Sequence, residues 1–422
     1  VVTASRMEEP LRRAPESITL IGAREIERSG KQTVVDVLRT VPGLSIQQSG
    51  TVGGEAYIHM RGTNNAHTLI LVDGVRIGDP VYFDGKISIA DFPADNVERI
   101  EVVRGNQGVL YGSDAIGGVI NIITKKGKGK PRWTLGAEGG SYETFRERLA
   151  FSGAWDRFDL AAAVSRLDSK GVSKADEDLG NREQDYYHDT AVSAKFNVRL
   201  TDASRAGVSA VHTRSKMDYD YDALMTGNLV DADVVQNVDI TTVSGHFEHE
   251  IAAAWQQTVK LGLTQTKREY FRDGGLFDGR YSGRIGFASW QHNVFIADKD
   301  TVTAGFDFQH EQGDSAAPWG DLPEQIARTK SVFLQNKWTQ VRNLEVTAGV
   351  RHDDHQVVGG ETTYKGAAAY LLEKTGTKFR GSYGTGFRAP SLYQLFDPTY
   401  GNPGLRPEKS RGWDAGIDQF LF

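Results

Sequence analysis

The sequence predicts a mainly antiparallel β protein, in which a small mixed α/β region precedes a long series of amphipathic strands. Three observations support this fold class. Glycine is abundant, with 47 residues, and aromatic residues make up 10% of the chain, which is typical of many strands joined by turns. From residue 132 onward, apolar and polar residues alternate with a period of two. The turns of this second region alternate between short and long.

The composition excludes several classes of protein. The chain has no cysteine, so it has no disulfide framework, no thiol catalysis and no cysteine-bound zinc. Its formal net charge of −6 argues against a large nucleic-acid interface and is compatible with an acidic surface that binds cations. No stretch approaches the run of about 18 apolar residues that a transmembrane helix requires.

The α/β region covers the first ~128 residues, as judged from turn and linker signals. Thr33 and Asp36 resemble a capping box, and apolar residues then recur at helical spacing, so we expect a helix over residues 34–41 that ends at Pro42. Strand-like runs lie at residues 57–62, 69–77, 97–104 and 119–124. Asp73-Gly74 predicts a tight hairpin turn within the second of these runs. A basic linker, residues 125–130, closes the region.

The second region has the pattern of a membrane barrel or of a soluble sandwich. Alternation is clearest at residues 158–165, 192–200, 302–308 and 346–351, and each run is near or slightly below the ~9–11 residues with which a tilted strand crosses a bilayer. Aromatic residues lie near the predicted strand ends, as in interfacial girdles: Tyr142, Trp155, Tyr187, Trp255, Trp290 and Trp338. Short turns at residues 154–157 and 200–203 contrast with long polar stretches at 168–187 and 216–238. Both folds show such alternation, and the repetition and loop asymmetry favour the barrel.

Segments of the α/β region resemble, in order and in sequence, the plug domain of TonB-dependent outer-membrane transporters. They are residues 61–64 (RGTN), 69–75 (LILVDGV), 97–105 (VERIEVVRG) and 110–124 (LYGSDAIGGVINIIT). Residues 383–392 and 401–410 resemble late-barrel segments of the same family. Within the family, the chain is most similar to the cobalamin receptors. The resemblance implies an antiparallel transmembrane β-barrel with an N-terminal α/β plug domain inside its lumen.

The same resemblance implies a division of the chain into the end of the TonB box (residues 1–6), the plug (residues 7–128) and a partial barrel (residues 129–422). Barrels of this family have 22 strands. We count roughly 14 after residue 132, so we expect the C-terminal strands of the barrel to be missing from this chain.

The resemblance also implies a function. It predicts active uptake of a scarce nutrient across the outer membrane of a Gram-negative bacterium, powered by a TonB-type protein that grips Val1, Val2, Thr3 and Ala4. Cobalamin is the leading substrate, and a ferric siderophore or haem is the alternative. A non-transporting surface receptor or adhesin is an alternative of a different class. No catalytic constellation is identifiable, so an enzyme is not expected, and neither is a nucleic-acid partner.

Acidic residues are concentrated in the two long polar stretches. The candidates are Asp176, Asp178 and Asp185 in the first stretch, and Asp220, Asp222 and Asp231 in the second. Calcium takes six to eight oxygen ligands, largely carboxylates, and two neighbouring loops can supply them together. The resemblance to cobalamin receptors implies that such a calcium ion orders the substrate site. Simple solvated acidic loops are the alternative.

Substrate contacts are expected, by the resemblance, from the barrel lumen and from two apical loops of the plug, residues 47–56 and 78–92. The candidate contacts are Ser49, Thr51, Asp79, Tyr82 and Phe83. Tyr82 and Phe83 could pack on a corrin or siderophore ring, and they could equally fill the lumen.

Two further groups of charged residues allow a structural interpretation. Arg61 and Arg104, with Glu98 and Glu101, are expected to form buried ion pairs that hold the plug against the barrel, or else to be ordinary strand-surface charge. The segment HDDH at residues 352–355 could bind a metal in isolation. Its two histidines point to opposite faces of a strand, so a metal site there is not expected.

Overall fold

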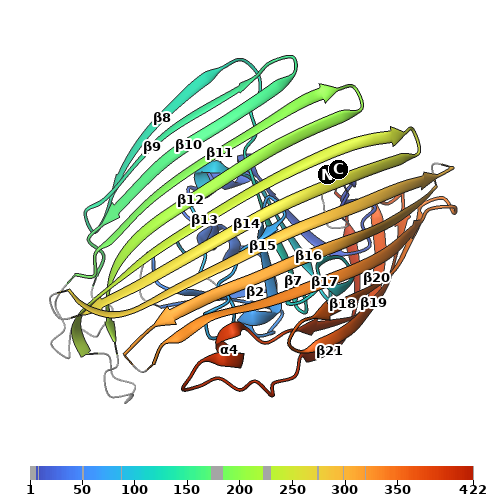
Figure 1. Ribbon diagram of the computed structural model, residues 1–422. Coiled ribbons are helices and arrows are strands. Elements are labelled where there is room, and N and C mark those ends of the chain that lie inside the picture. The colour runs from blue at the N-terminus through green and yellow to red at the C-terminus, as the bar shows by residue number, and fades with distance from the viewer. Residues whose placement is uncertain are drawn as a thin grey trace.

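A long antiparallel sheet wraps around the N-terminal α/β region in the computed structural model (Figure 1). The structure describes residues 6–7, 9–49, 52–86, 88–172, 184–221, 230–272, 275–297, 299–318 and 320–421, and only the backbone of residues 219, 221 and 230–233. No helix in these ranges is long and apolar enough to cross a membrane.

The plug is built on a five-stranded sheet with the order β1-β6-β7-β4-β5. Its strands are β1 (Ser17–Gly22), β4 (Thr68–Val72), β5 (Val75–Arg76), β6 (Val97–Arg104) and β7 (Gly118–Thr124). A separate hairpin joins β2 (Leu44–Gln48) to β3 (Ala56–Met60), and the short helices are α1 (Ala23–Ser29), α2 (Val34–Leu38) and α3 (Gly108–Tyr111). Single 3-10 turns lie at Asn65–His67 and Ala94–Asn96. Only β4 and β7 pair in parallel within this sheet.

Local signals placed several of these elements correctly. The Thr33 hydroxyl accepts a hydrogen bond from the Asp36 backbone N–H at the start of α2. Asp73 and Gly74, with φ of 49° and 82°, form the two-residue turn between β4 and β5, a conformation that Asp-Gly tolerates well. Residues of β6 and β7 such as Ile100 and Ile120 are fully buried in the plug core. The expected strands and hairpin of the plug are therefore confirmed.

Other plug elements differ from the prediction. The helix expected over residues 34–41 ends at Leu38 and is followed by turns, because Pro42-Gly43 stops the chain before a longer helix can form. β1 and α1 were not predicted, since a six-residue strand followed by a seven-residue helix is too short to show a period. β1 nevertheless completes one edge of the plug sheet by pairing with β6.

The long sheet has 14 strands, and each pairs antiparallel with the next along the chain. They are β8 (Arg132–Gly140), β9 (Thr144–Ala154), β10 (Phe158–Ser169), β11 (Tyr187–Thr201), β12 (Ser204–Tyr221), β13 (Val230–Ala252), β14 (Trp255–Arg272), β15 (Leu276–Ile296), β16 (Asp300–Ala316), β17 (Leu322–Trp338), β18 (Leu344–His355), β19 (Gly359–Leu372), β20 (Thr377–Arg388) and β21 (Glu408–Gln419). A five-residue helix, α4 (Leu392–Phe396), lies between β20 and β21. The strand count expected from the sequence is confirmed.

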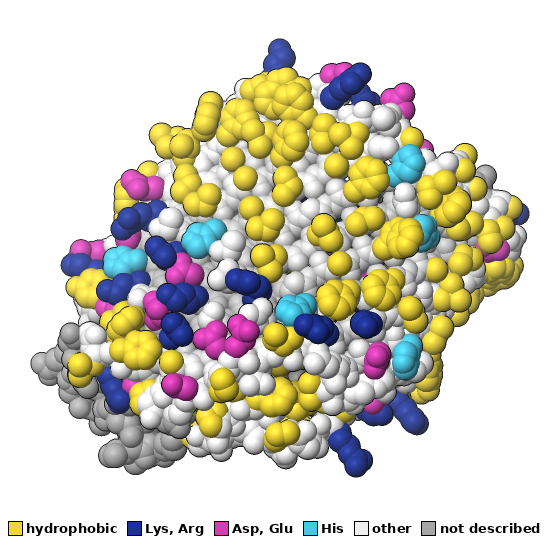
Figure 2. Space-filling view, in the orientation of Figure 1, with side chains coloured by type: hydrophobic (Ala, Val, Ile, Leu, Met, Phe, Trp, Pro, Cys, Tyr) yellow, Lys and Arg dark blue, Asp and Glu magenta, His cyan; other side chains and the backbone are white. Residues whose placement is uncertain are grey.

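The two faces of this sheet differ in chemistry. Residues that face the plug are buried and polar, such as Thr264, Asp307 and Gln335, whereas apolar residues of the opposite parity, such as Phe306 and Leu334, are exposed. Figure 2 shows these apolar side chains spread over the outer face. An apolar outer face and a polar inner face are the pattern of a barrel that spans a membrane.

Several strands are longer than the sequence predicted. β13 has 23 residues and β15 has 21, and the stretch 216–238, expected to be a long loop, is strand up to Tyr221 and again from Val230. Alternation between apolar and polar residues fades where both faces of a strand are polar, so the ends of these strands carry no periodic signal. Asp220 and Asp231 consequently lie in β12 and β13 and not in a loop.

Candidate functional site

The two apical loops lie at the end of the long sheet that carries its long connections, and hydrogen bonds fix the second of them, residues 78–92, to the surrounding elements. Asp91 accepts hydrogen bonds from the Tyr187 hydroxyl of β11 (2.7 Å) and the Ser215 hydroxyl of β12 (3.0 Å). On the opposite side, Ser391 donates to the Tyr82 carbonyl (3.2 Å). The second apical loop is therefore fastened to β11 and β12 through Asp91 and to the N-cap of α4 through Tyr82.

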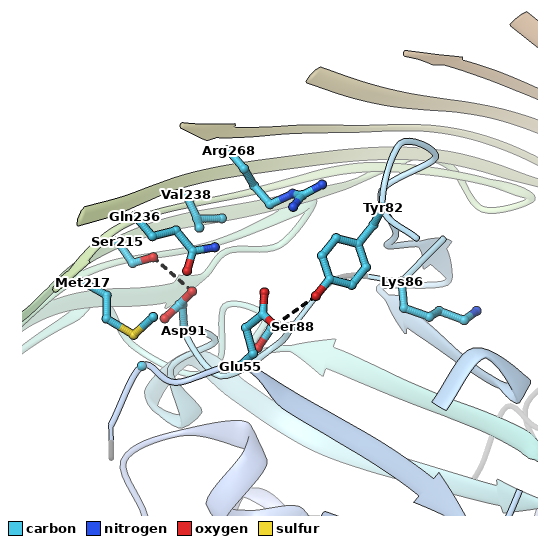
Figure 3. Close-up of a pocket in the computed structure, with 11 residues that line it drawn as sticks. Glu55, Tyr82, Lys86, Ser88, Asp91, Ser215, Met217, Gln236, Val238 and Arg268 are labelled. Carbon is cyan, nitrogen blue, oxygen red and sulfur yellow. Dashed lines mark hydrogen bonds between the residues drawn. The ribbon is translucent and has the colours of Figure 1, made fainter. Parts of the chain in front are cut away.

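A small pocket lies between these loops and the sheet (Figure 3). Plug residues Gly53, Glu55, Tyr82, Lys86, Ser88 and Asp91 line it together with Ser215, Met217, Gln236, Val238 and Arg268 of the sheet. Its cavity is about 20 Å³, which is room for about one water molecule. A large ligand must therefore sit above this pocket or open it by moving the apical loops.

Arg268 of β14 is the central side chain of the pocket wall. Its guanidinium donates to the Asp79 carboxylate (2.7 Å) and to the Tyr270 hydroxyl (2.9 Å). It also lies 4.5 Å from the ring centroid of Tyr82 and 4.7 Å from that of Tyr281, within the range of cation–π attraction. Asp79 is completely buried, so this ion pair fixes the second apical loop to the sheet.

Glu55 and two tyrosines form a second polar group in the pocket. The Glu55 carboxylate accepts hydrogen bonds from the hydroxyls of Tyr57 (2.8 Å) and Tyr82 (2.9 Å), and Figure 3 shows the Tyr82 ring between Arg268 and Glu55. Burial, reinforced by Glu55, raises the pKa of Tyr57 to about 12 and raises that of Tyr82 further. Both phenols therefore stay protonated at neutral pH and act as hydrogen-bond donors.

The cationic side chains at the pocket each have a carboxylate partner. Lys86 and Arg76 both donate to Asp114, at 3.0 and 2.7 Å. Burial opposes the ionisation of Asp114, but these two cations outweigh it and lower its pKa. Beside them, Arg388 of β20 pairs with Glu408 at 2.6 Å. The described residues at the pocket thus leave no lysine or arginine without a carboxylate.

The predicted substrate residues differ in where they lie. Asp79 and Tyr82 belong to the pocket wall through their contacts with Arg268. Phe83 is 48% exposed and packs on Tyr82 with centroids 4.6 Å apart, so part of its ring remains accessible at the surface. Ser49 is exposed, and its backbone N–H donates to the Glu55 carbonyl (3.0 Å). Thr51 lies outside the described residues.

Glu55, Tyr57 and Arg268 line the site but were not predicted from the sequence. Arg268 stands in the mixed run Lys267-Arg268-Glu269, where only strand parity separates the inner from the outer face. That parity is readable from the alternation just before it, in which Leu261 and Leu263 have one parity and Thr264 and Thr266 the other. A count along β14 from these threonines would have placed Arg268 in the lumen.

The proposed metal ligands lie mostly beyond the described residues. Asp176, Asp178 and Asp222 fall outside them, and the side chain of Asp231 does as well. Asp185 and Asp220 are buried and have polar partners. Among the described residues no group of three or more carboxylates and histidines is placed to hold a metal.

One buried carboxylate near these residues is only partly satisfied. Asp189 of β11 is 5% exposed and lies close enough to Asp91 for their charges to repel. Its Oδ1 atom has no hydrogen-bond partner within the described part of the chain. A buried carboxylate oxygen without a hydrogen bond costs free energy, so Asp189 is an unusual position in this part of the sheet.

The opposite end of the plug carries a series of ion pairs between its N-terminal segment, residues 6–16, and successive strands of the sheet. Arg6 contacts both oxygens of Asp307 in β16, at 3.1 and 3.0 Å, and Arg351 of β18 donates to the same carboxylate at 2.6 Å. Val1, Val2, Thr3 and Ala4, predicted to contact the coupling protein, precede this segment and lie outside the described residues.

The remaining contacts of the N-terminal segment use lysines of the sheet. Lys337 pairs with Glu9, and Lys365 donates to Glu16 (2.7 Å) and to Gln107 of the plug (2.9 Å). Lys378 donates to the backbone carbonyls of Leu11 (3.2 Å) and Ala14 (3.0 Å). We call these contacts and the Arg6–Asp307 pair the N-terminal clamp.

The predicted pairing of Arg61 and Arg104 with Glu98 and Glu101 is wrong. Arg61 pairs with Asp414 of β21, and Arg104 donates to the Pro42 carbonyl (2.7 Å) and the Thr19 hydroxyl (2.8 Å). Glu98 pairs with Lys128 and Glu101 with Arg99. Arg61 does join the plug to the sheet, but its partner is 353 residues away, beyond the reach of local sequence reasoning.

The histidines of the segment 352–355 lie as predicted. His352 is exposed on the outer face of β18, where it contacts the Thr362 hydroxyl (2.9 Å). His355 is buried on the inner face and accepts hydrogen bonds from the backbone N–H groups of Val357 and Val358. The two rings therefore do not form a shared metal site.

A larger cavity of about 500 Å³ lies between the β4–β5 hairpin and strands β11–β15. Lys195 of β11 closes part of it by pairing with Asp73 of the hairpin turn at 2.7 Å. The cavity is lined by both plug and sheet residues, so any movement of the hairpin changes its size.

Comparison with known proteins gives matches over nearly the whole chain. Residues 10–119 match the TonB-dependent receptor plug domain, and residues 132–422 match the TonB-dependent receptor-like β-barrel. The chain is 29% identical over 423 residues to the vitamin B12 transporter BtuB of Vibrio vulnificus and 26% identical over 417 residues to that of Photobacterium profundum. In each case the match covers 99% of this chain and 66% of the relative. The chain thus spans slightly less than two thirds of the length of these relatives.

Solved structures with the same fold include receptors for iron chelates. A mutant of the ferric enterobactin receptor PfeA from Pseudomonas aeruginosa superposes with a TM-score of 0.78 at 21% identity, covering 100% of this chain and 71% of that one. The siderophore receptor PirA from Acinetobacter baumannii gives a TM-score of 0.79 at 19% identity, covering 96% and 68%. At these identities the likeness establishes the fold alone.

Proposed function

The chain belongs to the TonB-dependent receptor family, and from that premise we propose that it serves in the uptake of cobalamin across the outer membrane of a Gram-negative bacterium. The energy would come from a TonB-type protein that pulls on the residues preceding the N-terminal clamp. The plug closes the lumen, and the apical loops receive the ligand.

The charges of the apical pocket are the observation that favours cobalamin over an anionic ligand. Arg268, Lys86 and Arg388 are each neutralised by a carboxylate, and Glu55 offers further negative charge. A ferric siderophore with several anionic groups would have to break these ion pairs in order to bind. Breaking a buried pair is strongly destabilising, so we expect such a ligand to bind poorly here. Cobalamin carries many neutral amide groups, which match the phenol donors of Tyr57 and Tyr82 and the carboxylate acceptor of Glu55.

The relatives support the same substrate. Both are named vitamin B12 transporters, and neither name is that of an enzyme, in agreement with the sequence analysis. The runner-up is uptake of a ferric siderophore or haem, as the names of the structural neighbours suggest. A non-transporting surface receptor or adhesin would have no use for a plug fastened by a clamp next to the predicted coupling residues.

The proposed mechanism uses the two ends of the plug differently. A ligand that binds the apical loops favours a plug state in which contacts at Tyr82 and Arg268 are altered. The Asp114 carboxylate links Lys86 of the apical loop to Arg76 of the β5 strand, which connects the pocket to the plug sheet. Pulling on the N-terminal segment then breaks the clamp one ion pair at a time.

We also propose a calcium ion near the apical loops, held by carboxylates of the two long connections and of the adjoining ends of β12 and β13. Asp185 and Asp220, with Asp176, Asp178, Asp222 and Asp231, are the candidate ligands. The incompletely satisfied carboxylate of Asp189 next to Asp91 fits a bound cation in this part of the molecule. When bound, the ion would order the connections and thereby the ligand surface.

Calorimetric titration of the full-length protein in detergent tests the substrate and the ion together. We expect cyanocobalamin to bind tightly with calcium present and more weakly after chelation, and a ferric catecholate to bind poorly in both conditions. Equal cobalamin binding with and without calcium would contradict the proposal that the ion orders the ligand surface. Tight binding of the ferric chelate with no binding of cobalamin would contradict the proposed substrate.

A further inference from the structure

Strand β14 connects the apical pocket to the larger cavity of about 500 Å³, because its inner face runs along plug residues 74–79 between the two. Three successive inward-facing residues of the strand donate hydrogen bonds to the plug: Arg268 to the Asp79 carboxylate (2.7 Å), Thr266 to the Gly78 carbonyl (3.2 Å) and Thr264 to the Arg76 carbonyl (2.8 Å). This row of contacts separates the pocket from the cavity.

The next two inward positions of β14 lie at the end of the row and at the cavity itself. A Cβ atom at Gly262 would lie 2.6 Å from the Cγ1 atom of Val75, so the lack of a side chain lets β5 pack closely on the strand. Lys260 and Gly74 both line the cavity. The Lys260 ammonium would lie 3.7 Å from a Cβ atom at Gly74, which places it beside the turn of the β4–β5 hairpin.

Lys260 is a cation of the cavity that no carboxylate opposes. It is half-buried, and it forms no hydrogen bond or ion pair with any residue in the described part of the chain. The other charged residues that line the cavity are offset by a carboxylate or a cation: Arg6 by Asp307, Arg99 by Glu101, Lys195 by Asp73, and Arg205 by Glu248 across the strands. A partly buried charge without a partner is unfavourable, so this position favours an anion.

The wall of the cavity around Lys260 is polar but uncharged. Hydroxyl and amide side chains from the inner faces of β13, β14 and β15 line it: Ser244, Gln256, Thr258, Ser289, Gln291 and Asn293. These groups donate and accept hydrogen bonds without carrying charge. The cavity therefore suits a ligand that has a single negative charge and many amide groups.

We propose that this cavity is a second binding site for the transported ligand, in which Lys260 binds a phosphodiester group of that ligand. The inference rests on the proposed function, because cobalamin carries one phosphodiester with a single negative charge and several neutral amides. A ferric catecholate with several negative charges would find too few free cations here. The single unopposed ammonium thus matches the same substrate as the apical pocket does.

Movement of the hairpin would give the ligand access to this site. When residues 74–79 separate from β14, the row of contacts opens and the apical pocket becomes continuous with the cavity. A corrinoid is larger than the ligands that usual pockets enclose, so the cavity of about 500 Å³ receives it only as the hairpin moves. Without Lys260, the phosphodiester would pass through this partly buried space with no opposite charge beside it, which would slow transport.

Energised uptake of two corrinoids by cells that express the full-length protein tests the second site. Cyanocobalamin carries the phosphodiester, whereas cobinamide has the same corrin ring without the nucleotide loop and its phosphate. The test variant is Lys260→Met, and Lys260→Arg retains the charge. The matched control is Lys267→Met, because Lys267 is exposed on the outer face of the same strand, where it pairs with Glu269.

We expect Lys260→Met to slow cyanocobalamin uptake by about tenfold, the order expected for one charge-assisted hydrogen bond. Cobinamide uptake by this variant should stay within about twofold of the parent. Lys260→Arg and Lys267→Met should take up both corrinoids as the parent does. The affinity of the purified proteins for cyanocobalamin, measured by calorimetry, should be the same in all four, because the apical pocket is unchanged.

Three outcomes would overturn the second site while the proposed substrate stands. They are unchanged cyanocobalamin uptake in Lys260→Met, an equal loss for both corrinoids in that variant, and a loss of its calorimetric affinity for cyanocobalamin, which would place the effect at the apical pocket. Failure of the parent to bind or take up either corrinoid is a different result. It would overturn the proposed substrate and the phosphodiester site with it.

Discussion

The two ends of the plug are held in the lumen by different chemistry. At the apical end, tyrosine and serine hydroxyls donate to carboxylates, as in the contacts of Tyr82 with Glu55 and Ser215 with Asp91, and one ion pair, Arg268–Asp79, is fully buried. At the other end, the N-terminal clamp joins residues 6–16 to the sheet by ion pairs and by lysine contacts to carbonyls.

This difference corresponds to the two tasks in the proposed mechanism. Neutral hydroxyl donors can exchange a protein acceptor for a ligand acceptor at little net cost, since a typical hydrogen bond contributes about 0.5–1.5 kcal/mol. Ion pairs shielded from water resist the loss of one partner far more strongly. The apical end is therefore suited to respond to a ligand, and the clamp to hold until force is applied.

The largest expected effect is at Arg268. The variant Arg268→Ala leaves the Asp79 carboxylate buried without its cation. This loss is expected to destabilise the folded state by about 3–5 kcal/mol. We expect hydrogen exchange of residues 78–92 to rise by at least about a hundredfold and cobalamin binding to be lost. Arg280→Ala on the neighbouring strand, which breaks an exposed pair with Asp314 at 3.3 Å, is the control and should cost less than about 1 kcal/mol. Similar behaviour of the two variants would contradict the role given to Arg268.

A nearly equal loss of protection from hydrogen exchange is expected at the N-terminal clamp, but there ligand binding should stay intact. In Lys365→Met the carboxylate of Glu16, whose Oε2 atom already has no hydrogen-bond partner in the described chain, loses its cation as well. We expect about 3 kcal/mol less protection of residues 9–16 in hydrogen exchange, and unchanged cobalamin affinity. Lys409→Met, which removes an exposed partner of Glu361, should leave exchange of this segment unaltered. A loss of ligand affinity in Lys365→Met would show that the two ends are not separable.

A moderate effect is expected from the backbone of the first apical loop. Gly53 has φ of 85°, and a Cβ there would lie 2.1 Å from a ring carbon of Tyr187. Gly53→Ala must therefore move the loop or the ring that donates to Asp91, at about 1–3 kcal/mol. We expect cobalamin affinity to fall by about tenfold in a calorimetric titration. Gly366→Ala, where no atom lies within 4 Å of the new Cβ, should bind as the parent does.

The smallest effect is a pH dependence of the clamp. Burial raises the pKa of Glu16, but Lys365 outweighs burial and the net pKa lies below the ordinary value of 4.5. A lowered pKa in the folded state stabilises above the unfolded pKa, and this stabilisation is lost as pH falls through the folded value. We expect exchange of residues 9–16 to increase only as the pH falls below about 4.5, towards the lowered pKa of Glu16. A midpoint between pH 6 and 7 would contradict this assignment.

The sequence predicted the parts of the fold that local signals determine. Thr33 with Asp36 and the Asp73-Gly74 turn depend on neighbouring residues and were placed correctly. The ends of β12 and β13 were not, because polar residues on both faces remove the period. Of the site, Asp79 and Tyr82 were found through the loop that carries them. Arg268 and the Arg61–Asp414 pair were missed, because each depends on which strand of the sheet lies beside the plug.

Uptake of radiolabelled cyanocobalamin by whole cells that express the full-length protein tests the central claim most directly. Cells with an active TonB-type protein are expected to accumulate the vitamin with time, whereas cells without it should show only a small, saturable amount bound at the surface. Equal accumulation in the two strains, or accumulation of a ferric siderophore in place of cobalamin, would contradict it.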